Sequence, residues 1–204
     1  MIALIRPECP NPQALANNKY NDPVNKETLR KSASGKCMYC ESKIEHNSFA
    51  HIEHIKPKAP DKFPELEFIW SNLGYSCQKC NNEKGDKYDI NTPFIDPYIE
   101  DPEDHILFFG FFVYAKQGSE RGEYTINEIQ LNRIGLIERR KERIDKINTM
   151  IKAAFRTSND KLRHQAVIEI KKEAEKDREY SAAVKNLLIV QGILRGSGTE
   201  KVDH

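Results

Sequence analysis

The segment HIEHIKPK, residues 51–58, gathers ionisable side chains next to one another. Glu53 is a hard oxygen donor that suits Mg²⁺ or Mn²⁺, and His54 carries an imidazole that accepts a proton near neutral pH. Further along, Asn81 offers an amide oxygen, and Lys84 follows it by one helical turn, where it could face a phosphate. One carboxylate and one amide leave room around a metal for water and phosphate oxygens. This set predicts metal-assisted phosphodiester cleavage.

Four of the five cysteines form two C-x2-C pairs, Cys37 with Cys40 and Cys77 with Cys80, and Cys9 is left over. Paired C-x2-C units in a protein of the reducing cytosol are typical of a structural Zn²⁺ site with four thiolate ligands. Reduced thiols or a redox pair are the alternative. The long separation between the pairs predicts a folded insertion, and it is this insertion that contains Glu53 and His54.

The elements that must position these residues are a strand, a loop, a second strand and a helix. The first strand runs through HIEHIK and ends at Pro57, the second covers LGYSC, and the helix starts near CNNEKGD. Neighbouring residues on a flat strand point to opposite faces. If Glu53 and His54 act on one substrate, a twist or a strand end must therefore occur at this position.

The remainder of the chain predicts an α+β protein with helices at its C-terminal end. ILFFGFFVYAK and GEYTI read as two strands joined by the turn QGSERG, and helical periodicity starts at Asn127 and resumes from Asp160, a candidate N-cap, to Leu194. We divide the chain into an arm, a zinc-bracketed core, a Pro-rich loop with a β-hairpin, a helical region and a disordered tail, at residues 1–36, 37–92, 93–126, 127–195 and 196–204.

Charge and hydropathy place few limits on partners. The formal net charge is +1, so no global electrostatic attraction to nucleic acid is expected. Residues 133–176 hold 13 Lys and Arg against 7 Asp and Glu, which fits either phosphate contacts or a solvated helix face. No apolar run approaches 18 residues and the first residues lack signal-peptide features, so we expect a protein of the bacterial cytoplasm with no membrane span.

The motif IEHIKPK…WSNL…SCQKCNNEKGDK resembles the HNH endonucleases, a ββα-metal class with flanking zinc cysteines. The resemblance implies that His54 is the general base, that Glu53 and Asn81 hold the catalytic Mg²⁺ or Mn²⁺, and that Asn72 braces the long loop. Glu at position 53 and Asn at position 81 depart from the commoner Asp and His, and both preserve oxygen ligation. The expected architecture is an HNH core with a four-cysteine zinc site, then a β-hairpin and C-terminal helices.

A closer resemblance extends to about residue 155. CMYCESKI, HIEHIKPK and TINEIQLNRIGLIERRKERI are similar to the PtuB-like HNH subfamily of Septu anti-phage systems and some retrons. This resemblance implies an effector nuclease that cleaves DNA or RNA, transfer RNA included, in a complex with a PtuA-like ATPase of the ABC/SMC type. In a retron the complex would also include a reverse transcriptase with its RNA–DNA product.

Several roles stay open at the level of sequence. His51 could share the face of Glu53 as a further metal or phosphate contact, or lie on the surface near the zinc. Lys56 and Lys58 face either phosphate or solvent, and Trp70 fits the core better than a base-stacking role. The alternative to an enzyme is a non-catalytic zinc module that binds nucleic acid or a partner protein.

Overall fold

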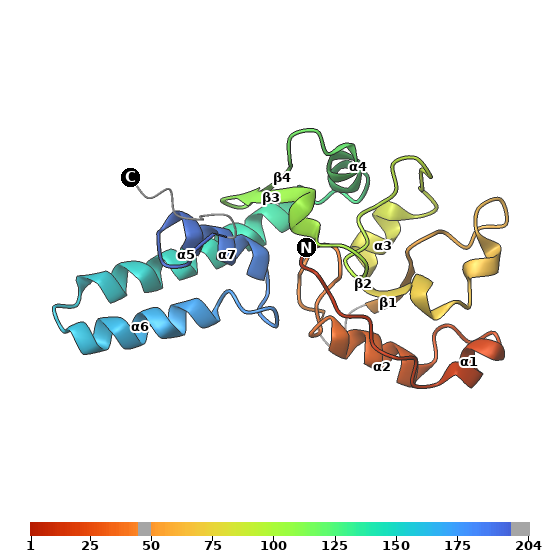
Figure 1. The fold of residues 1–204 in the computed structure, drawn as a ribbon, viewed down its shortest axis with the longest axis horizontal. Coiled ribbons are helices and arrows are strands. Elements are labelled where there is room, and N and C mark those ends of the chain that lie inside the picture. The colour runs from red at the N-terminus through yellow and green to blue at the C-terminus, as the bar shows by residue number, and fades with distance from the viewer. Residues whose placement is uncertain (45–49, 197–204) are drawn as a thin grey trace, which may run out of the picture.

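A computed structural model describes residues 1–44 and 50–196, so the predicted tail at 196–204 lies almost wholly outside the described residues. Figure 1 shows an elongated molecule, with the N-terminal helices and a small ββα unit at one end and the C-terminal helices at the other. The elements before the hairpin region are α1 (Pro12–Ala16), α2 (Pro23–Ser32), β1 (Ala50–His54), η1 (Pro64–Leu66), η2 (Trp70–Asn72), β2 (Leu73–Cys77) and α3 (Gln78–Lys84). Those after it are η3 (Pro102–Asp104), β3 (Ile106–Phe109), β4 (Phe112–Ala115), α4 (Glu120–Glu128), α5 (Ile134–Arg156), α6 (Asp160–Lys172) and α7 (Ser181–Val190).

The ββα unit follows the predicted order of strand, loop, strand and helix, which confirms the α+β class. Strands β1 and β2 pair antiparallel, with Ala50 opposite Cys77 at one end and His54 opposite Leu73 at the other. Helix α3 begins directly after β2 and packs against both strands. β1 ends at His54, three residues before Pro57, where the sequence predicted the end of the strand.

The prediction that GEYTI forms the second strand of the hairpin is wrong. The hairpin lies wholly within ILFFGFFVYA, where Phe109 pairs with Phe112 and Gly110 turns the chain at a φ of +60°. GEYTI belongs instead to α4, which Ser119 caps by accepting a hydrogen bond from the Gly122 amide at 3.1 Å. The β-branched and aromatic residues of GEYTI favour a strand, but the capping serine and the burial of one helix face outweigh that preference.

The predicted helix from Asp160 to Leu194 is two helices. α6 ends at Lys172 and α7 begins at Ser181, after Tyr180 in the left-handed region at a φ of +53°. Asn159, rather than Asp160, caps α6 by accepting a hydrogen bond from the Leu162 amide. The break lets α7 fold back, so that α5, α6 and α7 share a small apolar core built around Ile147, Ile151, Ile170, Val184 and Leu188.

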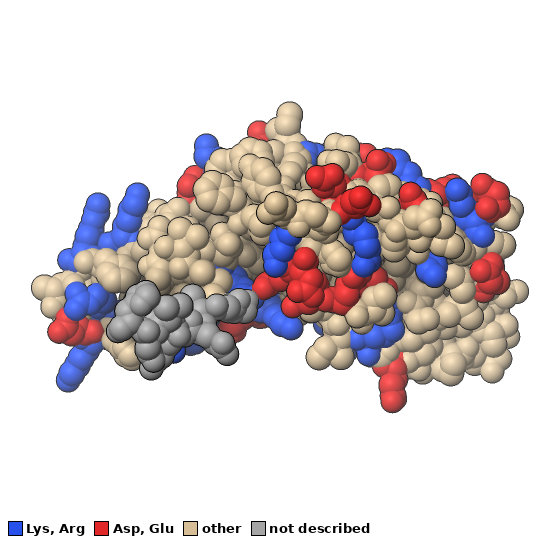
Figure 2. Space-filling model, turned by 45° about the horizontal axis from the view of Figure 1, so that its top comes forward, with Lys and Arg blue, Asp and Glu red and all other residues tan. Residues whose placement is uncertain are grey.

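The surface carries charges of both signs. On the face in Figure 2, acidic side chains gather near the centre, and lysines and arginines project from the end formed by α5 and α6. Within the described part of the chain, no helix is both long and apolar enough to cross a membrane.

Candidate active site and metal centres

The four paired cysteines converge, although they come from two segments of the chain. Their Sγ atoms all lie within 4.8 Å of one another, and those of Cys40 and Cys77 are 3.9 Å apart. A tetrahedral Zn²⁺ with bonds of about 2.3 Å to each sulfur sets the sulfur atoms about 3.8 Å apart. The cluster therefore fits a structural Zn²⁺ site.

The cysteine cluster joins the loop before β1 to the start of α3. Cys37 and Cys40 lie on that loop, Cys77 ends β2 and Cys80 lies in the first turn of α3. The Cys77 thiol also accepts a hydrogen bond from the Cys80 amide at 3.5 Å, in the manner of a helix cap. A metal here fixes the helix that carries Asn81 relative to the strand that carries Glu53.

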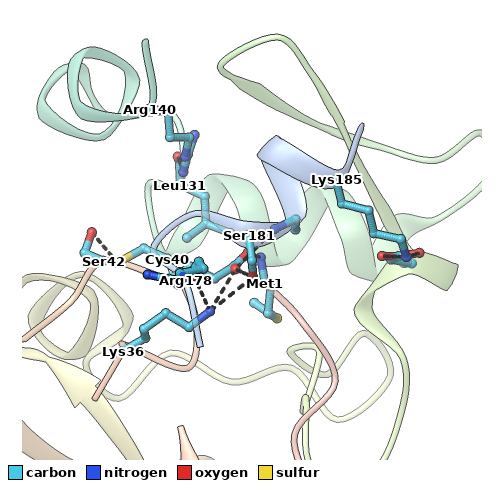
Figure 3. A network of polar contacts seen from close by, with 12 residues as sticks. Met1, Lys36, Cys40, Ser42, Leu131, Arg140, Arg178, Ser181 and Lys185 are labelled. Atoms are coloured by element: carbon cyan, nitrogen blue, oxygen red, sulfur yellow. Dashed lines mark hydrogen bonds and ion pairs between the residues drawn. The ribbon is translucent and has the colours of Figure 1, made fainter. Parts of the chain in front are cut away.

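A buried polar network ties the same loop to the C-terminal helices (Figure 3). Glu41, next to Cys40, accepts hydrogen bonds from the Met1 amine at 2.6 Å and the Ser181 hydroxyl at 2.7 Å. Lys36 lies 3.3 Å from the same carboxylate and donates to the carbonyl of Arg178 at 2.9 Å. Burial disfavours the ionised form of Glu41, but the charges of Met1 and Lys36 outweigh it and lower its pKa to about 2. These contacts tie the start of α7 to the loop that carries Cys37 and Cys40, which we call the zinc loop.

Glu53 points from β1 toward α3 and is 2% exposed. Its Oε1 lies 2.8 Å from the Nζ of Lys84 and accepts a longer hydrogen bond of 3.4 Å from the hydroxyl of Tyr39. Burial raises the pKa of the Glu53 carboxyl, and the adjacent Lys84 ammonium opposes that rise. The carboxylate therefore sits in a dry position where one cation holds it.

Lys84 lies inside the ββα unit, with 1% of its surface exposed, and not on the open face of α3. Besides Glu53, its ammonium donates to the main-chain oxygen of His54 at 2.8 Å. These contacts place Lys84 between the last turn of α3 and the end of β1. Its direct neighbour is the proposed metal-binding carboxylate, so the position differs from the phosphate-facing one expected from helical spacing.

His54 ends β1 and points to the face opposite Glu53, where it is partly buried. Its Nε2 lies 3.0 Å from the main-chain oxygen of Glu67, and its ring meets the edge of Tyr20 at a centroid distance of 4.8 Å. Because a carbonyl only accepts, Nε2 must donate, and the neutral ring keeps its lone pair on Nδ1. Burial lowers the pKa of His54, which favours this neutral form.

Asn72 closes the loop between the strands. Its side chain accepts from the Lys56 amide at 2.8 Å and donates to the carbonyls of Lys56 and Leu66 at 3.0 and 3.1 Å. The Leu66 carbonyl is next to Glu67, the residue that receives the His54 hydrogen bond. Asn72 therefore sets the position of the acceptor for the His54 ring.

The other candidates lie at the margin of this site. Asn81 is partly buried on α3, one turn before Lys84, and its side chain makes no hydrogen bond with any described residue. His51 is partly buried opposite Ser76 in the β1–β2 ladder. Lys58 pairs with Glu67 at 2.7 Å. Lys56 is exposed, with its ammonium 5.5 Å from the centre of the Phe63 ring.

Three residues of the site were not found from the sequence. Tyr39 contacts Glu53, Tyr20 contacts the His54 ring, and Glu67 supplies the carbonyl that the ring binds. The position of Tyr39 inside the first C-x2-C pair is the one signal that sequence offers for any of them. The roles of Tyr20 and Glu67 depend on how the arm and the loop fold over the strand.

The comparison with known families identifies the class. Residues 37–87 match the HNH endonuclease family, and this range spans both cysteine pairs, both strands and α3. The chain therefore carries an HNH endonuclease domain, as its motif predicted, and such a domain indicates an enzyme that acts on phosphodiester bonds.

Two relatives narrow the resemblance. The chain is 29% identical over 188 residues to the Septu protein PtuB of Bacillus thuringiensis, a match that covers 84% of this chain and 71% of the relative. It is 30% identical over 189 residues to the Septu protein PtuB of Bacillus mycoides (strain KBAB4), which covers 77% of this chain and 64% of that relative. The predicted similarity to PtuB-like proteins is confirmed, and it reaches well beyond the HNH domain.

Proposed function

We propose that this chain is a metal-dependent endonuclease and the effector subunit of an anti-phage defence complex of the Septu type. Its substrate is a nucleic acid, either DNA or RNA, with transfer RNA included. The observation that carries the proposal is the position of His54 and Glu53 at the end of β1, within an HNH domain that the cysteine cluster holds together. The similarity to Septu proteins supports the biological setting.

The chain's own chemistry centres on His54. The hydrogen bond from Nε2 to the Glu67 carbonyl holds the ring in place and leaves Nδ1 as the atom that accepts a proton from the attacking water. Asn72 maintains this arrangement through the loop that carries Glu67. We assign His54 as the general base and Asn72 as a positioning residue.

The catalytic metal is held by Glu53 and Asn81, with His51 as a further candidate. Lys84 and Tyr39 both contact Oε1 of Glu53. Asn81 and Lys84 lie one turn apart on the same face of α3, and Lys84 contacts Glu53. Hard oxygen ligands favour Mg²⁺ or Mn²⁺, and such an ion supplies Lewis-acid stabilisation of the phosphate. Lys84 favours the ionised form of the carboxylate and orients it, and Lys56 and Lys58 are weak nucleic-acid contacts.

The proposed partner is a PtuA-like ATPase in the bacterial cytoplasm. A near-neutral chain gains little affinity for nucleic acid from its net charge, so an ATPase subunit would supply part of the binding surface. A retron reverse transcriptase with its RNA–DNA product is a further partner for this proposal. Co-purification with the proteins of neighbouring genes, followed by mass spectrometry, tests both.

A second function has one observation in its favour. Lys84 already balances the charge of Glu53 inside the fold, so the Glu53 carboxylate has a partner without a catalytic metal. A zinc module that binds nucleic acid or a partner protein without cleaving would look the same in this respect. The two functions differ in whether Mn²⁺ binds and in whether phosphodiesters are cut.

Cleavage of labelled plasmid DNA and of bulk transfer RNA in Mg²⁺ or Mn²⁺ tests the assignment. The wild type is compared with His54→Ala and with His164→Ala, a matched control on an exposed helix face, each with the neighbouring ATPase. We expect the wild type and His164→Ala to cut, and His54→Ala to lose activity at unchanged zinc content. Cleavage by His54→Ala would overturn the role of the base. Nucleic-acid binding without Mn²⁺ binding or cleavage would favour the zinc module.

A further inference from the structure

A continuous basic groove runs between the zinc loop and helix α5. One hollow of about 320 Å³ lies between the zinc loop, the start of α3 and the first turn of α5, and a second of about 610 Å³ continues along α5. Lys43 and Arg139 line both hollows, so the two form one feature. We call this feature the α5 groove.

Six basic side chains line the α5 groove against two acidic ones, Glu142 and Glu179. The basic residues are Lys43, Lys79, Arg133, Arg139, Arg143 and Lys146. The groove thus carries four more positive than negative side chains, whereas the whole chain has a net charge of only +1. The basic bias of residues 133–176 is therefore concentrated in part on one concave surface.

Two of the six cations already have internal partners. Arg133 donates to the Sγ of Cys80 at 3.4 Å, and Arg143 pairs with Glu173 at 2.5 Å. The side chains of the other four, Lys43, Lys79, Arg139 and Lys146, are exposed and make no hydrogen bond or ion pair with any residue that the structure describes. The negative charge of a zinc–thiolate cluster explains the position of Arg133. It does not explain the four cations that make no hydrogen bond to the sulfur atoms.

The arrangement of these cations has an energetic consequence. Arg139, Arg143 and Lys146 follow one another at spacings of four and three on one face of α5, where like charges repel, and Glu173 offsets part of that repulsion by pairing with Arg143. Lys43 adds charge across the groove. A polyanion relieves this repulsion and releases counterions when it binds, whereas a purely solvated helix face has no need of a concave cluster.

The α5 groove lies within reach of the proposed active site. It starts at Cys77, which pairs with Ala50 at the end of the β1–β2 ladder opposite His54. Four residues of an extended strand span about 13 Å, which corresponds to about four nucleotides along one strand of a duplex at ~3.4 Å each. A strand cut beside His54 therefore has phosphates at the distance of the groove.

We propose that the α5 groove binds the sugar–phosphate backbone of the nucleic acid beside the cleavage site, through Lys43, Lys79, Arg139 and Lys146. This inference rests on the proposed function and deepens it, because it assigns the surface that holds the substrate. Phosphate contacts position a strand without reading its bases, so the groove confers affinity and register and leaves sequence preference to other surfaces.

The test compares two variants that each remove four positive charges. The groove variant carries K43Q, K79Q, R139Q and K146Q. The control variant carries K152Q, R156Q, K161Q and K171Q, exposed cations on α5 and α6 outside the groove. Fluorescence anisotropy with labelled single-stranded RNA, single-stranded DNA and duplex DNA is measured in EDTA from 50 to 300 mM salt, on the full chain with verified zinc content.

We expect the groove variant to bind at least about tenfold more weakly than the control variant and to show a shallower salt dependence, by about 0.7–0.9 in the slope for each phosphate that the variant no longer binds. The probe whose affinity falls most identifies the substrate as RNA or DNA. Equal affinities and slopes for the two variants would overturn the proposal, as would a wild type that binds none of the probes. If the groove variant loses zinc, R139Q with K146Q against K152Q with R156Q makes the same comparison on residues of α5 alone, without changes in the zinc loop or in α3.

Binding and cleavage separate this inference from the proposed function. A wild type that binds through the groove but cuts no nucleic acid with its ATPase present contradicts the nuclease assignment and leaves the groove assignment intact. A wild type that cuts, with a groove variant that binds as tightly as the control variant, contradicts only the groove assignment.

Discussion

The Nζ of Lys84 lies 2.8 Å from Oε1 of Glu53, and the two side chains are 1% and 2% exposed. The pair connects the last turn of α3 to β1 at the centre of the HNH domain. Removing water from two charges is costly, and only close contact and additional hydrogen bonds offset that cost. Here Tyr39 and the His54 carbonyl supply those bonds.

Breaking this pair from one side should therefore destabilise the domain strongly. We expect Lys84→Met to lower the free energy of unfolding by about 3–5 kcal/mol, because it leaves a buried carboxylate without a cation. The double variant Glu53→Gln with Lys84→Met should recover much of that loss. Urea unfolding followed by tryptophan fluorescence measures both variants, and Lys87→Met, which removes an exposed pair with Glu128, serves as the control with an effect below about 1 kcal/mol. Equal effects of Lys84→Met and Lys87→Met would show that the buried pair is not a support of the fold.

The hydrogen bond from His54 to the Glu67 carbonyl depends on Asn72. Asn72→Ala removes three hydrogen bonds in the partly buried loop, and we expect a loss of about 1–3 kcal/mol in unfolding free energy. The variant should also lose cleavage activity, since the acceptor for Nε2 moves with the loop. Histidine ¹⁵N NMR tests the link directly: the wild type should show His54 as the Nε2–H tautomer, and the variant should show a mixture. A ring that keeps the same tautomer in Asn72→Ala would remove Asn72 from its positioning role.

The ββα unit and the cysteine cluster were predictable because their signals are local in sequence. Each C-x2-C pair brings two thiols to one side of a turn, and a second such pair completes a tetrahedron. The first strand was predictable from HIEHIK, although it ends at His54, three residues before the predicted end at Pro57. The contacts of Tyr20 and Glu67 with His54 were not predictable, because they join segments whose separation in the chain carries no spacing rule.

The errors have a common physical origin. GEYTI has strand propensity, but Ser119 caps a helix there, and this helix buries Thr125 and Ile126 against the rest of the fold. The break between α6 and α7 carries no glycine or proline, and the left-handed Tyr180 is held by its hydroxyl contact with Ser42 at 2.9 Å. Tertiary contacts determine the secondary structure at both positions, and local propensity alone does not predict such contacts.

Loss of one zinc ligand should unfold the domain, since binding of a structural zinc supplies about 10–16 kcal/mol in small zinc modules. Cys80→Ala removes a thiol that is fully buried at the start of α3, and we expect loss of the metal and of cooperative unfolding. Cys9→Ala, which removes the thiol outside the cluster, is the matched control and should retain one zinc per chain. Elemental analysis and thermal unfolding measure the outcome. Normal zinc content and melting in Cys80→Ala would contradict a four-cysteine site.

Glu100 provides a pH test away from the cysteine cluster and the proposed active site. Burial disfavours its ionised form, but hydrogen bonds from Arg121 and His105 outweigh that effect, so the pKa of Glu100 in the folded protein lies below its ordinary value of 4.5. A carboxyl with a lowered folded pKa stabilises the fold above its unfolded pKa and loses this contribution as the pH falls. We expect Glu100→Gln to lower the free energy of unfolding by about 1 kcal/mol at pH 7, and the difference from the wild type to shrink as the pH drops below 4.5. Urea unfolding of both proteins from about pH 7 to about pH 3 measures this difference, and a constant difference across the range would show that ionisation of Glu100 does not contribute to stability.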